Sequence, residues 1–423
     1  MSQHNEYRGK VLIVAPFWET KNHVGNYRIE RFIKWLQEKN YSVILLKAAF
    51  KNDLKEKEWG LEISVIDRVG KISDFFVRTT PKVKTKIFSY IWYALVLFFS
   101  PVDPYFFWTR NVKNNKLLSR YMNNIDLILS SSPPNSGLIA AYKLSKKYSI
   151  PLMVDLRDGW LDEPLISGLR KPGIRKSFEG RLEKKILSHA VKIFVTSIIW
   201  KNMLSDRLPA VRDKISLLTN AYPEFEFTSS TFYNENHNLD VKLLYAGRFT
   251  GSSYLRNPEI LFNPLYNELL SKHYATELLL LSNLKRKDNK HMDYWISRFK
   301  RIGCTLSSMP QVNREKMLEM ITNSDGLLLL STSRAPIPSK AFEYIKSSKP
   351  ILAVTLKDSA VWQMCNNIPQ MFLFDYTEQK PDYTQVEKFL SACQTGEYEY
   401  NIPEEYSEEY LSKIFLNTID KIY

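Results

Sequence analysis

Short apolar runs alternate with amphipathic stretches along most of the chain. Val11–Pro16 is rich in β-branched residues, as expected for a strand that is buried on both faces. Residues 26–40 continue with a helical pattern that Asn40 is suited to end, and the apolar positions of this pattern are Ile29, Phe32, Ile33 and Leu36. The chain therefore begins with a strand followed by a helix.

The same alternation continues through two series. In the first, further apolar runs predict strands at residues 41–46, 61–66, 125–131, 151–156, 191–197 and 215–220. A second series of runs lies at residues 241–247, 276–282, 326–331, 350–355 and 370–376. Strands that alternate with amphipathic helices are typical of βαβ units and a parallel sheet.

Residues 223–238 interrupt the pattern with polar and turn-forming side chains, which predicts a linker. We therefore expect an N-terminal domain over residues 1–222 and a C-terminal domain over residues 239–403. The amphipathic residues 404–423 are predicted to form a helix that crosses back to the N-terminal domain. Two doubly wound α/β domains bind ligands at the carboxyl ends of their strands, so we expect a cleft where both edges face.

Composition narrows the class of protein. The chain has 423 residues, enough for two domains, and 44% hydrophobic with 25% charged residues is typical of a folded protein. The net charge of +14 favours an anionic partner.

The cysteines Cys304, Cys365 and Cys393 are scattered, which predicts neither a disulfide framework nor a zinc site and favours a reducing compartment. The polar N-terminus predicts no signal peptide, hence a cytoplasmic protein.

The motif that says most about function lies in residues 337–353. Pro338 suits the start of a helix, whose first N–H groups and dipole form an anion site, and Ser339 and Lys340 lie beside it. Glu343 lies one turn further, and its side chain leans toward the helix N-terminus. It is therefore placed to accept hydrogen bonds from a ribose diol while a diphosphate lies at the helix end. An ordinary surface helix would show the same spacing.

The motif Pro-x-Lys-x-x-Glu-Tyr, followed by Lys-Pro-Ile-Leu, resembles the nucleotide-sugar site of the family 4 retaining glycosyltransferases. That family has the GT-B fold, two Rossmann-like domains facing a central cleft, and its Glu matching Glu343 holds the nucleotide ribose. The fuller family motif has a second Glu eight positions earlier, and this chain has Ala335 there. This difference affects how the hydroxyl groups of the donor sugar would be recognised. The single-Glu form resembles a bacterial subgroup active on surface polysaccharides.

A second element follows the predicted strand at residues 241–247. Gly247 and Arg248 resemble the family's Gly-Arg pair, whose Arg and a later basic residue grip the donor diphosphate; Arg256 matches that later residue loosely. Two cations in place of Mg²⁺ would stabilise the leaving phosphate, so no metal or other cofactor is expected. A surface salt bridge is the alternative role for either arginine.

Three charged residues lie at the end of the predicted strand at 151–156 or directly after it: Asp155, Arg157 and Asp158. With the Ser-Pro-Pro turn at residues 132–134, they also resemble the subgroup. We interpret them as acceptor-binding or proton-handling groups, with Asp155 and Asp158 as catalytic candidates and Arg157 as donor-binding. An Arg157–carboxylate pair that clamps the loop is the structural alternative, and both roles are compatible.

The loop after the first strand carries Gly25, Asn26 and Arg28, in the position of the family's donor-facing loop. Gly25 and Arg28 are therefore donor-binding candidates, although Gly25 also suits a simple turn.

One segment has the composition of a helix that contacts a membrane. The apolar run Ile87–Phe99 would span about 20 Å as a helix, short of the roughly 30 Å of a bilayer core. It is preceded by lysines and is rich in aromatic residues, so it either lies on an anionic membrane surface, through Lys82, Lys84, Lys86 and Trp92, or packs in the core. A basic run at residues 167–185 adds to the first possibility.

Together these features predict a metal-independent glycosyltransferase that moves a sugar from a nucleoside-diphosphate sugar to a glycan or lipid-linked acceptor. The resemblance to family 4 implies retention of configuration and a role in bacterial surface-polysaccharide (lipopolysaccharide) synthesis. Nucleic acid is not an expected partner, since no recognition motif is evident. Two alternatives remain open: an isomerase resembling nucleotide-sugar 2-epimerases, and an inactive GT-B binding protein.

Overall fold

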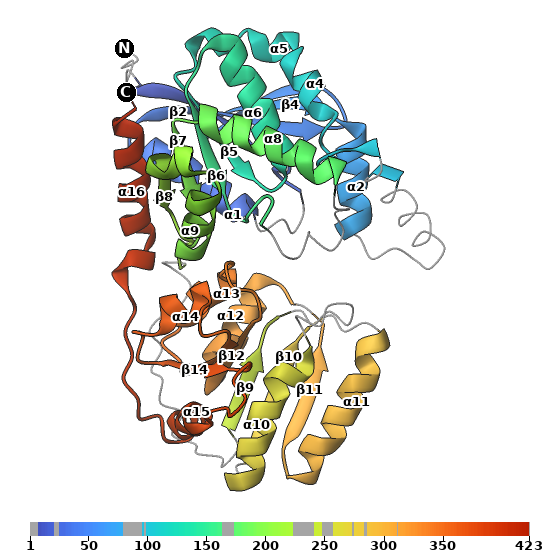
Figure 1. The fold of residues 1–423 in the computed structure, drawn as a ribbon, viewed down its shortest axis with the longest axis vertical. Helices are drawn as coiled ribbons and strands as arrows, with labels where there is room; N and C mark the ends of the chain where they lie inside the picture. Colours follow the sequence, from blue (N-terminus) through green and yellow to red (C-terminus); the bar gives the residue numbers. More distant parts are fainter. Residues whose placement is uncertain are drawn as a thin grey trace. The chain divides into compact units, whose positions relative to one another are not determined.

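The computed structural model describes residues 7–20, 25–78, 95–96, 99–162, 173–222, 241–247, 257–272, 275–282, 286–310 and 312–422. The chain forms two compact units (Figure 1). Unit 1 consists of Met1–Leu218 together with Ser412–Tyr423, and unit 2 consists of Thr219–Leu411. The predicted linker at 223–238 lies outside the described residues.

Unit 1 is built on an eight-stranded sheet with the order β3-β4-β2-β1-β5-β6-β7-β8. All neighbours are parallel except β3, which is antiparallel to β4. The strand order reverses between β1 and β5, which is the switch point of a doubly wound sheet. The strands are β1 (Gly9–Val14), β2 (Tyr41–Ala49), β3 (Asp53–Lys57), β4 (Gly60–Ile66), β5 (Leu127–Ser132), β6 (Leu152–Leu156), β7 (Lys192–Val195) and β8 (Ile215–Leu217).

Helices cover this sheet: α1 (Gly25–Glu38), α2 (Arg68–Arg78), α4 (Trp108–Lys113), α5 (Lys116–Ser119), α6 (Asn135–Tyr148), α8 (Ile174–His189) and α9 (Ile198–Arg207), with 3₁₀ turns η1 (Met122–Asn124) and η2 (Pro209–Lys214). The apolar positions predicted for the first helix are all buried on α1. Asn40 follows α1 with a left-handed φ of 59° and ends it as expected.

The C-terminal helix α16 (Glu408–Asp420) contributes to the core of unit 1. Phe415 stacks on Phe32 of α1, with ring centroids 4.8 Å apart. At the end of α16, the hydroxyl of Tyr41 donates to Oδ1 of Asp420 at 3.1 Å. Residues distant in sequence thus complete the packing of α1.

Unit 2 is a six-stranded, fully parallel sheet with the order β11-β10-β9-β12-β13-β14, which reverses between β9 and β12. Its strands are β9 (Val241–Tyr245), β10 (Thr276–Leu281), β11 (Thr305–Met309), β12 (Gly326–Ser331), β13 (Ile351–Thr355) and β14 (Met371–Asp375). Apolar clusters bury both faces of this sheet. Its helices are α10 (Pro258–Lys272), α11 (Arg286–Arg301), α12 (Arg314–Thr322), α13 (Ser339–Lys346), α14 (Ala360–Cys365) and α15 (Thr384–Thr395), with the 3₁₀ turn η4 (Glu404–Tyr406).

The predicted α/β class with two doubly wound sheets is confirmed. Of the apolar run Ile87–Phe99, only the end is described: Leu95 and Phe99 are 50% and 66% exposed, whereas Val96 is buried. Among the residues that the structure describes, no helix combines the length and the apolar character needed to cross a bilayer.

Candidate functional site

The loop after β12 leads into a helix N-terminus at the switch point of unit 2. The helix α13 begins at Ser339, and Pro338 occupies the N-cap position with φ −58°, one residue earlier than expected for a first-turn proline. Pro338 offers no side-chain cap to the N–H groups of the first turn. Such N–H groups and the helix dipole favour an anion.

Lys340 and Glu343 lie on the first turns of α13. The ammonium of Lys340 is 3.9 Å from Oε2 of Glu343, and its side chain is 30% exposed. Burial lowers the pKa of Lys340, the charge of Glu343 opposes this, and the nearby Arg314 lowers the pKa further. A partly desolvated cation beside a helix N-terminus is well suited to bind a phosphate group.

Two residues of α12 belong to this cluster, and no pattern in the sequence predicts a site role for either. Nη1 of Arg314 lies 3.4 Å from Oε1 of Glu343, and Sδ of Met317 lies 2.7 Å from Nζ of Lys340. The only local sign was Asn313, which accepts from the N–H of Lys316 and caps α12. A capping residue predicts where a helix begins, but it does not predict which residues the helix contacts. The pairing of Arg314 with Glu343 is therefore visible only in the tertiary structure.

A hydrogen bond connects α13 to the end of β9. The hydroxyl of Tyr344, fully buried, accepts from the N–H of Ala246 at 3.1 Å. The next residue, Gly247, packs so closely that an added Cβ would lie 2.3 Å from the hydroxyl oxygen of Tyr245. A side chain at 247 is therefore excluded without rearrangement. Arg248 and Arg256, predicted to grip the diphosphate, lie outside the described residues.

In unit 1, Asp155 and Arg28 form a buried ion pair between β6 and α1. Nη2 and Nε of Arg28 donate to Asp155 at 2.7 and 2.9 Å, and Oγ of Ser131 donates to Oδ2 at 2.6 Å. Asp155 is completely buried and Arg28 is 5% exposed. Arg28 also donates to the carbonyl of Leu218 at 2.9 Å. Direct contact of Asp155 with a substrate would require this pair to open.

Arg157 extends in another direction. Its Nε donates to the carbonyl of Ser132 at 3.2 Å, its Nη2 donates to the carbonyl of Pro133, and its guanidinium lies 4.9 Å from the ring centroid of Phe17. These hydrogen bonds attach Arg157 to carbonyls at the end of β5 and directly after it, whereas Asp155 pairs with Arg28. A Cβ added to Gly25 would lie 2.2 Å from Nη1 of Arg157, so Gly25 permits this position of the arginine.

Asp158 lies beside these groups at the carboxyl edge of unit 1. Burial raises the pKa of its carboxyl group and Asp155 raises it further, while the positive charge of Arg157 opposes the shift. The adjacent Gly159 packs directly against the ring of Trp200. A carboxyl group with a raised pKa at a strand end is a candidate for proton transfer or for binding a hydroxyl group.

A carboxyl group of the chain itself lies at the start of the helix that follows β5. Oδ2 of Asp103 accepts from the N–H of Ser136 at 2.7 Å, at the N-terminus of α6. Asp103 therefore satisfies an N–H group in the first turn of this switch-point helix, which a bound phosphate would otherwise be able to use.

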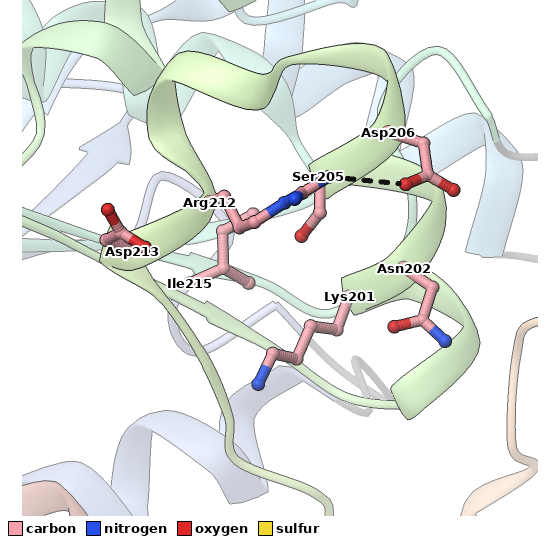
Figure 2. Close-up of a pocket in the computed structure, with 7 residues that line it drawn as sticks. All are labelled: Lys201, Asn202, Ser205, Asp206, Arg212, Asp213 and Ile215. Carbon is pink, nitrogen blue, oxygen red and sulfur yellow. Dashed lines mark ion pairs between the residues drawn. The ribbon is translucent and has the colours of Figure 1, made fainter.

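A hollow of about 560 Å³ lies elsewhere on unit 1 (Figure 2). Its wall comes from α9, η2 and β8, and Arg212 and Asp206 pair there at 3.7 Å. Lys201 and Asp213 also line it, so its charges balance, and none of the predicted site residues lies on its wall.

Within the described ranges, no group of three His, Cys, Asp or Glu side chains is arranged to hold a metal ion.

Comparison with known proteins shows the fold. No family model matches the chain. It superimposes on sucrose-phosphate synthase from Thermosynechococcus elongatus (TM-score 0.62, 11% identity, 98% of this chain and 99% of that one). It also superimposes on α,α-trehalose 6-phosphate synthase from Burkholderia multivorans (TM-score 0.64, 11% identity, 99% of both chains) and on Anabaena Alr3699/HepE in complex with UDP (TM-score 0.62, 10% identity, 98% and 100%). The fold of this chain is GT-B.

One curated relative is similar over a shorter stretch. The ATP-dependent RNA helicase RhlB of Vibrio atlanticus (strain LGP32) is 25% identical over 162 residues, which is 36% of each chain. The chain thus matches about a third of that relative's length, too little to define a shared family.

Proposed function

We propose that this protein is a glycosyltransferase that moves a sugar from a nucleoside-diphosphate sugar to a hydroxyl group of a glycan or lipid-linked acceptor, with retention of configuration, in surface-polysaccharide synthesis. The observation that carries the proposal is the cluster at the N-terminus of α13. There Lys340, Glu343 and Arg314 meet at the switch point of a parallel sheet. Support also comes from the structural neighbours, among them Anabaena Alr3699/HepE in complex with UDP and glucose.

In this proposal the donor binds mainly to unit 2. The diphosphate lies at the start of α13, near Pro338 and Ser339, with Lys340 as its cation, and Glu343 accepts hydrogen bonds from the ribose hydroxyls. Arg248, which follows Gly247, and Arg256 contribute further positive charge. These cations replace a metal ion, and no other cofactor takes part.

Transfer then occurs on one face of the donor sugar. The acceptor oxygen bonds to the anomeric carbon as the bond from that carbon to the phosphate oxygen breaks, and the acceptor proton passes to the departing phosphate. Lys340 and Arg248 stabilise the phosphate charge. Asp158 binds the acceptor hydroxyl, Arg157 and Gly25 shape the loop beside it, and the Arg28–Asp155 pair positions α1 against β6.

The test begins with thermal-shift screening against UDP, GDP, ADP and CMP, followed by transfer assays with the sugar nucleotides of the base that binds. Glu343→Ala and Arg248→Ala should each lower transfer at least about a hundredfold, the scale of removing one preorganised transition-state contact. Activity should persist in EDTA. Full transfer in both variants would refute this site. Conversion of donor without acceptor would indicate the 2-epimerase-like alternative, and binding without turnover across an acceptor panel would indicate an inactive binding protein.

A further inference from the structure

Three helices of unit 1 present a surface with charges of one sign. The helices α4, α6 and α8 lie together on one face of the sheet (Figure 1). Neither α4 nor α6 contains an acidic residue, and the acids of α8, Glu179 and Glu183, are 0% and 1% exposed. The exposed charged side chains of these helices are therefore all cationic: Arg110, Lys113, Lys146, Lys147, Lys176, Arg181, Lys184 and Lys185.

The separation of signs follows from the packing. Glu183 pairs with Arg207 at 2.5 Å, and Glu179 accepts from Nε1 of Trp160 at 2.9 Å and pairs with Arg175 at 3.4 Å. Both acids point inward and are neutralised there, so they do not offset the outer cations. A surface without a partner normally mixes both signs. This surface therefore favours an extended anionic partner.

Exposed aromatic side chains lie within the same surface. Phe107 and Phe178 are 48% and 41% exposed, and both contact Phe106, with ring centroids 5.7 and 6.5 Å apart. On α8, the residues Phe178, Arg181 and Lys185 recur at positions i, i+3 and i+7 and so share one helical face. Aromatic groups set among cations fit the headgroup boundary of a bilayer, where rings enter the interface and cations meet lipid phosphates.

We propose that the α4–α6–α8 surface docks this protein on a membrane that contains anionic lipid. Lys82, Lys84, Lys86 and Trp92 lie outside the described residues, so the proposal rests on other cations. These are the cations of α4 and α6 and four cations of α8 that belong to the basic run at 167–185: Lys176, Arg181, Lys184 and Lys185. Of the basic run at 167–185, the described part forms the first turns of α8. Docking does not depend on the proposed enzymatic activity, because it can be measured as binding.

The test is vesicle co-sedimentation of the full chain, with vesicles of phosphatidylcholine alone or mixed with phosphatidylglycerol. Wild type should bind the mixed vesicles, and binding should fall as salt rises. The variant Lys113→Glu/Lys146→Glu/Arg181→Glu, with one change in each helix, should bind them at least about tenfold more weakly. The matched control Lys300→Glu/Arg301→Glu/Lys388→Glu, which changes exposed cations of unit 2, should bind like wild type.

A second pair of variants tests the aromatic contribution. Phe107→Ser/Phe178→Ser should weaken binding to mixed vesicles, whereas Phe50→Ser/Tyr400→Ser, which removes rings elsewhere that are more exposed (59% and 61%), should not. Equal binding to neutral and mixed vesicles, or an equal loss in the unit 2 control, would overturn the proposal. So would binding to soluble polyphosphate without binding to vesicles, because the partner would then be a soluble polyanion.

Discussion

The hydroxyl of Tyr344 accepts a hydrogen bond from the N–H of Ala246 at 3.1 Å, and this contact holds α13 against the end of β9. Both residues are buried, and they lie 98 positions apart in the sequence. The bond fixes the helix that carries Lys340 and Glu343 relative to the strand that ends before Gly247. In the proposed donor site, Lys340 and Glu343 are thereby positioned before a ligand arrives.

Tyr344→Phe removes that acceptor and leaves the buried N–H of Ala246 without it. We expect a loss of stability of about 1–3 kcal/mol, because the amide loses its partner without gaining water. The KM for donor should rise more than kcat falls, since the contact positions α13 and does not touch the reacting atoms. Urea unfolding and steady-state kinetics measure the two effects. An unchanged KM would show that α13 is held by other contacts.

Asp155→Ala leaves Arg28 buried without its carboxylate. Breaking one side of a buried ion pair costs about 3–5 kcal/mol, because the remaining charge is desolvated. The double variant Arg28→Met/Asp155→Leu should recover much of the loss, since apolar side chains of similar size can replace such a pair. Urea unfolding of both variants and wild type makes the comparison. A double variant as unstable as the single one would indicate that the pair has a role beyond charge compensation.

Gly25→Ala places a methyl group 2.2 Å from Nη1 of Arg157 and 2.7 Å from Cε2 of Phe17. The arginine can move, but Phe17 is completely buried, so we expect the guanidinium to leave the carbonyls of Ser132 and Pro133. Transfer should fall by about tenfold, the scale of a modest displacement of a positioned group. Gly180→Ala on α8 is the matched control, because its nearest contact is the flexible side chain of Leu161 at 3.3 Å. Equal activity in the two variants would argue against a role for Arg157.

Donor binding should depend on the protonation of Lys340. Burial lowers the pKa of Lys340, so the ammonium is lost at a lower pH than in an ordinary lysine. Since only the ammonium attracts the diphosphate, donor affinity should decline as pH rises through that lowered pKa. Lys340→Arg stays charged and should remove the alkaline decline. Calorimetric titration across pH checks this, with Lys346→Arg on the same helix as control. Parallel profiles for Lys340→Arg and wild type would contradict it.

The apolar pattern of the sequence does not predict two of the strands, and both lie at sheet edges. β3 has the sequence DLKEK and pairs with β4 in a hairpin, whereas β11 pairs only with β10. An edge strand is half exposed, so it need not show a continuous apolar run. Central strands such as β1 and β12 are buried on both faces, and their composition alone identified them.

By itself, the sequence determined the class of fold and the positions of the candidate site residues along the chain. Apolar periodicity is a local property, and it specified the buried strands and the inward face of α1. The tertiary structure decided which charged groups meet: Asp155 pairs with Arg28 across 127 positions, and Arg314 reaches Glu343 across 29. Such pairs depend on strand order and on the direction of each side chain, and both are set by packing between distant segments.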